Sequence, residues 1–352
     1  MDAGRITAGN LVPALVAHAA KRGFPLGYRA QGGDPCAWRE RMLPHVRALV
    51  LPDLEPVPFA PEVVAEEDRG DHVVRRLRLH MSGGIVAPAL LARPKGQGPF
   101  PGVLALHDHG SEFRIGKEKC LAPPGPVPEV AQGWWERFFG GRPYGEELAR
   151  RGFVVLSLDA LNWGERAGNG YEAQQALASN LLHLGLSCAG VMAWEDVRAA
   201  EYLAALPEVD AARVAAVGFS LGAFRAWQVA ALSPHVAAFV SSCWMASLPG
   251  LLVEGNNQIR GQSAFWTVHP MLHRDFDLPD IAALAAPKPG FFQWGADDSL
   301  FPPPAVAEAQ AKLSEVWSAH GASERLRFDL RPGGHDFGPQ RQAAAFDWLQ
   351  RR

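Results

Sequence analysis

Short apolar runs of strand length alternate with segments of helical periodicity along most of this chain. The apolar runs lie at 102–107, 153–159, 213–219, 235–242, 290–295 and 325–331, and the helical patterns at 144–151, 172–205, 221–232, 304–320 and 339–351. A strand buried on both faces reads as a continuous apolar run, and a helix between two such strands makes a right-handed crossover. The alternation therefore predicts an α/β fold in which a mostly parallel sheet of roughly eight strands is flanked by helices.

The residues ahead of this alternation predict a smaller unit. Helical patterning from about residue 11 to residue 50 is followed by the proline-rich link LPDLEPVPFAPE, which cannot be helical. Alternating polar and apolar residues then flank Ser82-Gly83-Gly84, which is a hairpin signal. We therefore expect an N-terminal helical extension or cap at 1–70 and a main domain at 71–352 that opens with two antiparallel strands. An irregular stretch at about 244–286 reads as an insertion in that domain.

Composition narrows the class of partner. Of 352 residues, 48% are hydrophobic and 20% charged, the net charge is −3, and the basic residues are scattered. These values indicate a sizeable core and no basic face for nucleic acid or an anionic membrane. Four cysteines lie far apart without a CxxC pair, as expected of free thiols in a reducing compartment. With no signal-like N-terminus and no apolar run of about 20 residues, we expect a cytoplasmic protein that binds a small molecule.

A G-x-S-x-G motif, with sequence GFSLG at 218–222, is the strongest chemical signal in the chain. It stands where the apolar run 213–219 gives way to the helical pattern 221–232. A tight strand-to-helix turn there would lift the serine hydroxyl above the sheet, and glycine leaves room for such a turn. A serine at this spacing could also be an ordinary turn or cap residue, but the placement favours Ser220 as a nucleophile.

A serine nucleophile needs a histidine to accept its proton and a carboxylate to orient that histidine. His335 lies in RPGGHDFGP, between the last apolar run and the last helical pattern, and is the candidate base. The candidate acid lies in GFFQWGADDSLFPPP, after the run 290–295. We prefer Asp298 to Asp297, because G-x-x-D followed by a short apolar step and Pro302 is the usual form of this loop in α/β-hydrolases. Asp297 would then cap the turn.

The tetrahedral intermediate of such a reaction needs two backbone N–H donors for its oxyanion. One would be the N–H of Leu221, and the other would come from the loop HDHG at 107–110. We assign the second donor to His109, with Asp108 as the alternative. The His-x-His pair in this loop could also bind zinc, but Ser111 stands where a lactamase-like site carries an aspartate. No metal and no cofactor are predicted.

Several aromatic side chains could wall a substrate pocket. Trp163 follows the apolar run 153–159, while Trp244, Trp266 and His269 lie in the irregular stretch 244–286. Aromatic residues are also the bulk of most protein cores. Both interpretations of these four residues, pocket wall and core, remain open.

Taken together, these segments resemble the dienelactone-hydrolase-like and acetyl-xylan-esterase-like branch of the α/β-hydrolases, over about residues 72–352. The resemblance rests on LALHDHGSEFRIGKEK, RPYGEELARRGFVVLSLDALNWGER, PEVDAARVAAVGFSLGAFRAW, the Asp298 loop and GGHDFG. It implies an α/β-hydrolase fold, a triad in the chain order Ser220, Asp298, His335, and hydrolysis of small acyl esters without cofactor or metal. It also places the 244–286 stretch where this fold commonly carries a lid. Dienelactone hydrolases proper use a cysteine nucleophile, so the resemblance does not extend to lactone opening.

The expected function is therefore a serine carboxylic-ester hydrolase for acetyl or short-acyl esters, working through an acyl-enzyme. Two alternatives stay open. One is a serine peptidase like prolyl oligopeptidase, although about 70 residues ahead of the domain are too few for the propeller that such enzymes usually carry. The other is a catalytically idle scaffold that only binds a small ligand. A small-molecule ester is the expected partner, and a homo-oligomer is possible.

Overall fold

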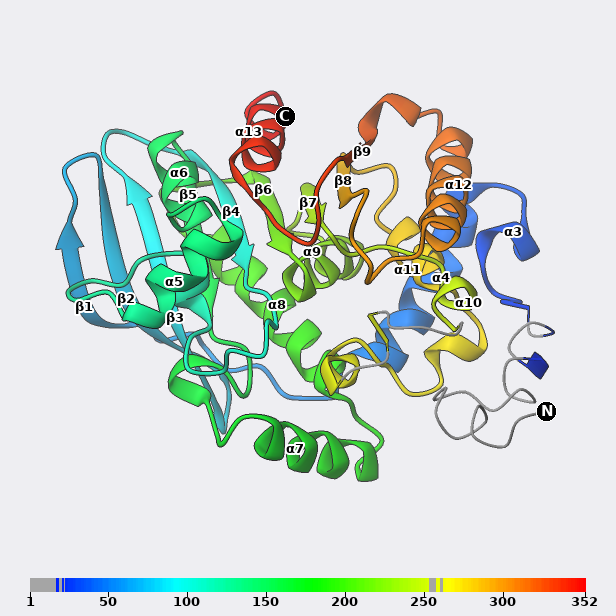
Figure 1. Ribbon diagram of the computed structural model, residues 1–352, viewed down its shortest axis with the longest axis horizontal. Coiled ribbons are helices and arrows are strands. Elements are labelled where there is room, and N and C mark those ends of the chain that lie inside the picture. The colour runs from blue at the N-terminus through cyan, green and yellow to red at the C-terminus, as the bar shows by residue number, and fades with distance from the viewer. Residues whose placement is uncertain (1–16, 19–20, 22, 253–257, 260–261) are drawn as a thin grey trace.

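The computed structural model describes residues 17–18, 21, 23–252, 258–259 and 262–352, and these residues build one large sheet between two layers of helices (Figure 1). Within them, nine strands pair in the order β1-β2-β3-β5-β4-β6-β7-β8-β9. The strands are β1 (Glu62–Asp68), β2 (His72–Ser82), β3 (Ile85–Pro94), β4 (Phe100–Leu106), β5 (Val154–Leu158), β6 (Val209–Phe219), β7 (Ala238–Ser242), β8 (Gly290–Gly295) and β9 (Leu326–Arg331).

The sheet is mixed rather than purely parallel. Strands β1, β2 and β3 pair antiparallel in succession and β3 is antiparallel to β5, whereas every pair from β5 through β9 is parallel. We expected roughly eight strands that open with one antiparallel pair. The described sheet has nine strands, and three strands, β1 to β3, form its antiparallel part. The additional strand is β1, whose sequence EVVAEED is largely exposed at the sheet edge and so lacks the apolar run of a buried strand. It lies inside the predicted extension 1–70, so the sheet begins ahead of the predicted boundary.

Two hydrophobic clusters fill the spaces between the sheet and its helices. One cluster draws on α4 (Pro35–Val50), α8 (Cys188–Ala205), α9 (Leu221–Leu232), α11 (Leu278–Ala283) and α12 (Pro303–Ala319). The other draws on α5 (Glu129–Phe138), α6 (Tyr144–Arg150) and α13 (Pro339–Leu349). Because side chains alternate across each strand, every central strand contributes to both clusters, which explains the continuous apolar runs.

The stretch predicted as helical at 11–50 is helical in part, with irregular backbone at 23–27 and 32–34. Helix α3 (Tyr28–Gln31) precedes α4, which Asp34 caps by accepting hydrogen bonds from the main-chain nitrogens of Cys36 and Ala37. Trp38 of α4 is fully buried in the cluster that α8 and α9 share. Residues 11–16, 19–20 and 22 of the predicted helical stretch lie outside the described residues.

The helical pattern predicted as one segment at 172–205 is two helices. Helix α7 (Tyr171–His183) ends before Gly185, which has a φ of 74°. Ser187 is the N-cap of α8, and its hydroxyl accepts a hydrogen bond from the main-chain nitrogen of Gly190. The two helices meet at 90°. No single described helix is long and apolar enough to cross a membrane, and this bent pair meets the length and composition criteria only jointly.

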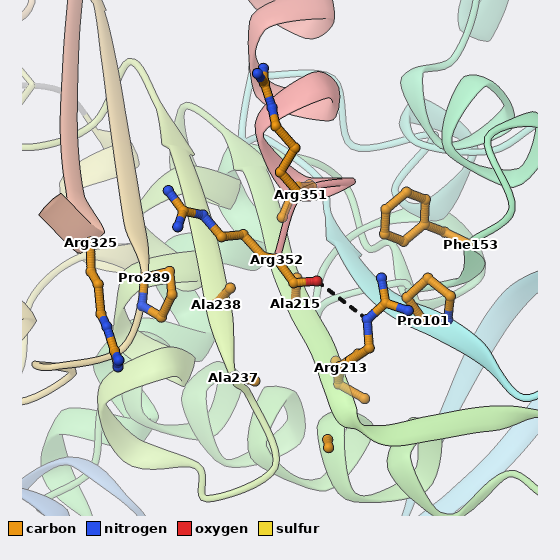
Figure 2. Close-up of a pocket in the computed structure, with 13 residues that line it drawn as sticks. Pro101, Phe153, Arg213, Ala215, Ala237, Ala238, Pro289, Arg325, Arg351 and Arg352 are labelled. Atoms are coloured by element: carbon orange, nitrogen blue, oxygen red, sulfur yellow. Dashed lines mark hydrogen bonds between the residues drawn. The ribbon is translucent and has the colours of Figure 1, made fainter.

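A hollow of about 380 Å³ opens at the edge of the sheet where the parallel strands begin (Figure 2). Its apolar lining consists of alanine, valine, proline, leucine and phenylalanine side chains, and the four other lining residues are exposed arginines: Arg213, Arg325, Arg351 and Arg352. Main-chain oxygens already engage two of these guanidinium groups, since Arg213 Nε donates to Arg352 O and Arg351 Nε donates to Asp347 O. No serine, cysteine, histidine or carboxylate side chain is among the described residues that line it.

Candidate active site

The predicted nucleophile lies in a strained turn between β6 and α9. Ser220 has φ 53° and ψ −124°, a left-handed backbone conformation that non-glycine residues rarely adopt. The flanking glycines are required by space: a Cβ at Gly218 would lie 2.0 Å from Gly222 O, and a Cβ at Gly222 would lie 1.9 Å from Leu106 O. The G-x-S-x-G spacing thus lets the turn pack against β4 while it holds the serine above the sheet.

His335 connects the predicted nucleophile to the predicted acid. Its Nε2 lies 2.8 Å from Ser220 Oγ and its Nδ1 lies 2.7 Å from Asp298 Oδ2. The histidine comes from the loop between β9 and α13 and the aspartate from the loop after β8, so both follow the carboxyl ends of parallel strands. The structure therefore brings these three residues together, although Ser220 and His335 are 115 residues apart in the sequence. In this geometry Nδ1–H donates to the carboxylate and Nε2 can accept the serine proton.

The two neighbouring aspartates have different partners. Asp298 binds His335 through Oδ2 and accepts the Leu300 N–H through Oδ1 at 3.1 Å. Asp297 instead exchanges hydrogen bonds with Gly333, whose N–H donates to Asp297 Oδ2 at 2.9 Å and whose carbonyl accepts the Asp297 N–H. The geometry thus selects Asp298 as the partner of the histidine, while Asp297 fastens the loop that carries it.

The two N–H groups predicted to bind an oxyanion are both uncommitted. Leu221 is the first residue of α9, so its N–H has no partner within the helix, and His109 lies in the loop after β4. Within the described part of the chain, neither main-chain nitrogen donates a hydrogen bond. Leu221 directly follows Ser220 and His109 lines the same pocket as the serine. Both residues are buried, as donors to a desolvated oxyanion should be.

A pocket of about 260 Å³ opens beside Ser220 and His335. Its apolar lining residues are Trp134, Phe138, Phe219 and Leu300, and its polar ones are Asp108, His109, Ser111, Gln258 and Ser263, together with Gly110. Gln258 and Ser263 belong to the 244–286 stretch, so that stretch reaches the pocket, whereas a role for it as a lid stays a prediction. The wall formed by α5 was not expected, because the pattern at 129–138 was not recognised as a helix.

The four residues expected to wall a substrate pocket do not line it. Trp163, Trp244 and Trp266 are almost fully buried, and Trp163 packs edge-on against Trp266 at 4.6 Å between ring centroids. His269 is buried next to α9, where the side-chain nitrogen of Gln228 donates to its Nε2 at 2.5 Å. These four residues are core side chains, and the pocket interpretation of them was wrong.

The His-x-His pair is held as neutral imidazole by protein groups. His107 Nδ1 donates to Asp108 O and its Nε2 accepts the Ala160 N–H, at 3.0 and 3.1 Å. His109 Nε2 donates to Gln174 Oε1 at 2.7 Å and its Nδ1 accepts the Ser111 N–H. Burial lowers the pKa of His109 to about 4 and that of His107 well below its ordinary value. All four ring nitrogens therefore have protein partners, and the pair is not arranged as a ligand set.

Sequence and structure comparisons agree on the fold. A family model described as Abhydrolase family matches residues 145–310, which include the turn at Ser220. YtaP of Bacillus subtilis strain 168, a protein named as a hydrolase, is 28% identical over 286 residues, covering 81% of this chain and 89% of that protein. The chain is an α/β-hydrolase by fold.

Solved structures with this fold include several esterases. A Bacteroides fragilis protein assigned as an acetyl xylan esterase superimposes with a TM-score of 0.69 at 17% identity, covering 90% of this chain and 81% of that one. A glucuronoyl esterase from Solibacter usitatus superimposes with a TM-score of 0.66 at 16% identity, covering 90% and 94%. These likenesses confirm the α/β-hydrolase fold that the sequence resemblance implied.

Proposed function

We propose that this protein is a serine carboxylic-ester hydrolase that removes acetyl or other short acyl groups from small-molecule esters. The observation that carries the proposal is the hydrogen-bonded chain from Asp298 through His335 to Ser220, which ends at a pocket. The esterase names of the structural neighbours agree with a carboxylic ester hydrolase.

Each step of the proposed reaction has a residue in place. His335 Nε2 accepts the proton of Ser220 Oγ, which attacks the ester carbonyl, and the N–H groups of Leu221 and His109 bind the resulting oxyanion. The carbon–oxygen bond to the alcohol then breaks, and the alcohol leaves with the proton from His335. Water, deprotonated by the same histidine, attacks the acyl-enzyme and releases the carboxylic acid and free serine. Asp298 keeps the histidine in the required tautomer and offsets its transient charge.

The pocket supports a small acyl group. Its volume of about 260 Å³ is below the range of roughly 300–1,000 Å³ that drug-sized ligands occupy. Rings of Trp134, Phe138 and Phe219 provide an apolar wall beside the serine, while Gln258 and Ser263 offer polar groups to an alcohol moiety. This combination fits a short apolar acyl chain esterified to a polar alcohol.

Hydrolysis of p-nitrophenyl esters of increasing chain length tests the proposal. We expect the highest kcat/KM with acetate or butyrate, a steep fall at decanoate, and no turnover of aminoacyl-proline amides. Ser220→Ala should abolish turnover, whereas Ser314→Ala, which removes an exposed hydroxyl from α12, should retain it. Turnover of the amides but not the esters would favour the peptidase, and activity that survives Ser220→Ala would contradict the proposed mechanism.

A further inference from the structure

Lys119 is a buried cation directly behind the loop that carries the predicted oxyanion donor. It ends a short 3-10 helix at Lys117–Lys119, and its side chain is fully buried. Its Nζ donates to two successive main-chain oxygens, those of Asp108 and His109, at 2.9 Å each. The ammonium also lies 3.6 Å from Asp108 Oδ2 and 4.7 Å from the centroid of the Trp134 ring. Three of these four contacts are with the loop at 107–110.

Because the peptide bond is planar, the contacts of Lys119 with these oxygens also determine the direction in which the neighbouring N–H groups point. In a trans peptide the C=O and the N–H of the next residue point in opposite directions. The carbonyl of Asp108 shares its peptide plane with the N–H of His109, and the carbonyl of His109 shares its plane with the N–H of Gly110. An ammonium that binds both oxygens therefore turns both N–H groups away from itself. His109 and Gly110 line the pocket that contains Ser220.

We propose that Lys119 is a positioning residue, which fixes the loop at 108–110 so that its N–H groups face the oxyanion of the reacting ester. This inference rests on the proposed function. Lys119 itself does not line the pocket, so it would act through the main chain of its neighbours. A charge-assisted hydrogen bond is roughly twice as strong as a neutral one, and polarisation of a carbonyl strengthens the donor on the same peptide.

The location of the charge indicates a specific role rather than general stabilisation. Burial lowers the pKa of Lys119, so keeping its ammonium here has a cost in stability, which the Asp108 carboxylate offsets in part. An uncharged donor, Trp163 Nε1, already binds the His109 oxygen at 3.2 Å. A second uncharged donor, His107 Nδ1, binds the Asp108 oxygen at 3.0 Å. Among the described residues, Lys119 alone binds both oxygens and alone brings a positive charge to the peptide that carries the His109 N–H.

Lys117 is a matched control two residues earlier. It is equally buried, but its Nζ binds three carboxylates, those of Asp159, Glu118 and Glu165, at 2.7, 2.8 and 3.0 Å. Within the described chain it makes no hydrogen bond to the loop at 107–110. A substitution at Lys117 therefore removes a buried ammonium, with a similar or larger loss of ion pairs, and leaves the carbonyls of that loop untouched.

The experiment compares Lys119→Met with Lys117→Met in the full chain. With p-nitrophenyl acetate, we expect Lys119→Met to lower kcat about 100-fold, as loss of one oxyanion donor does, while KM changes less than about threefold. A trifluoromethyl ketone, which forms a tetrahedral alkoxide adduct with a serine nucleophile, should lose affinity by a similar factor. Lys117→Met should leave kcat and this affinity within a few-fold, whatever it does to the melting temperature.

Equal losses of kcat in both variants, or wild-type kcat in Lys119→Met, would overturn the inference. If Lys119→Met does not fold, Lys119→Gln takes its place, because its amide can still donate to one carbonyl; we expect about a tenfold loss of kcat, and an unchanged kcat would again overturn the inference. Failure of the proposed function is recognised separately, because Ser220→Ala would then retain activity in an otherwise wild-type chain.

Discussion

A hollow lies at each end of the parallel strands, and the smaller of these two hollows is the one that adjoins a candidate nucleophile and base. At the amino-terminal edge, about 380 Å³ is surrounded by four arginines on an apolar floor. At the carboxyl-terminal edge, about 260 Å³ lies beside a serine, a histidine and an aspartate linked by hydrogen bonds. The comparison teaches that volume alone does not identify the site.

The difference arises from how strands end. At the carboxyl edge, the loops after β4, β6, β8 and β9 supply His109, Ser220, Asp298 and His335, and each has a defined partner or pocket position. At the amino edge, all four arginines are exposed and two of them donate to main-chain oxygens at the surface. Ligands of open α/β sheets bind outside the carboxyl ends of the strands, because loops from several strands converge there.

The largest expected effect is the loss of activity on removal of His335 at the carboxyl edge. His335→Ala should lower kcat/KM for p-nitrophenyl acetate on the order of 10⁴-fold or more, because His335 is the one base among the described residues that is hydrogen-bonded to Ser220 Oγ. The control is His80→Ala, which changes an exposed histidine on β2. A loss of less than tenfold in His335→Ala would mean that the hydrogen-bonded chain at the carboxyl edge is not the catalytic machinery.

A second comparison sharpens the assignment within the carboxyl edge. Asp298→Asn should lower kcat on the order of 10³- to 10⁴-fold, since an amide cannot hold the histidine in the required tautomer. Asp297→Asn removes the charge from the adjacent residue, which binds Gly333 instead, and should lower kcat less than about tenfold. Steady-state kinetics of the two variants distinguish these outcomes, and the reverse order of effects would exchange the roles of the two aspartates.

Stability should depend on pH through buried neutral histidines on the catalytic side. Burial lowers the pKa of His269 to about 3 and that of His109 to about 4. Because these folded-state pKa values lie below the unfolded value of about 6.5, the unfolded state binds more protons as the pH falls. The stability that comes from keeping these two histidines neutral is fully present above about pH 6.5 and is lost as the pH falls toward their folded-state pKa values. Each histidine should contribute a loss of roughly 2 kcal/mol in the free energy of unfolding between pH 7 and pH 5.

Urea unfolding of His269→Gln at these two pH values tests this expectation. The variant should show a smaller loss of stability between pH 7 and pH 5 than the wild type, whatever its stability at pH 7. The exposed variant His80→Gln should keep the wild-type loss. If His269→Gln shows the same pH dependence as the wild type, the imidazole is not buried as a neutral group.

The smallest effect is expected at the amino edge. The double variant Arg213→Gln and Arg351→Gln removes two of the four cations around the larger hollow. Because the edge is separated from Ser220 by the length of β6, kcat/KM for short esters should stay within twofold of the wild-type value. A loss above tenfold without a change in melting temperature would show that the two edges are coupled, and would break the comparison.

Much of the architecture, and the candidate site residues Ser220, Asp298 and His335, could be predicted from local patterns. The bounds of β8 and α9 agree with the sequence expectation, because a buried strand and a fully buried helix both read as apolar runs. Ser220, Asp298 and His335 were found because each follows a strand in a loop with a characteristic sequence. The distances between these residues depend on the order of the strands in the sheet. Only the resemblance to α/β-hydrolases, with its order of site residues along the chain, indicated that the three would meet.

The remaining features depend on contacts that no local pattern encodes. Strand β1 is a charged edge strand and was therefore missed. Trp244 and Trp266 were expected near the pocket, but an aromatic residue in an irregular stretch reads the same whether it faces a cavity or the core. Lys119 lies in GKEK, a segment typical of the resemblance, yet its partners are main-chain oxygens of another loop, which side-chain patterns do not reveal.

Labelling with a fluorophosphonate probe, followed by mass-spectrometric mapping of the modified peptide, tests the central claim most directly. The account predicts a single adduct on Ser220, formed in step with loss of ester hydrolysis, unaffected by a chelator and absent from Ser220→Ala. Labelling at another serine, or inactivation by the chelator with Ser220 unmodified, would contradict it.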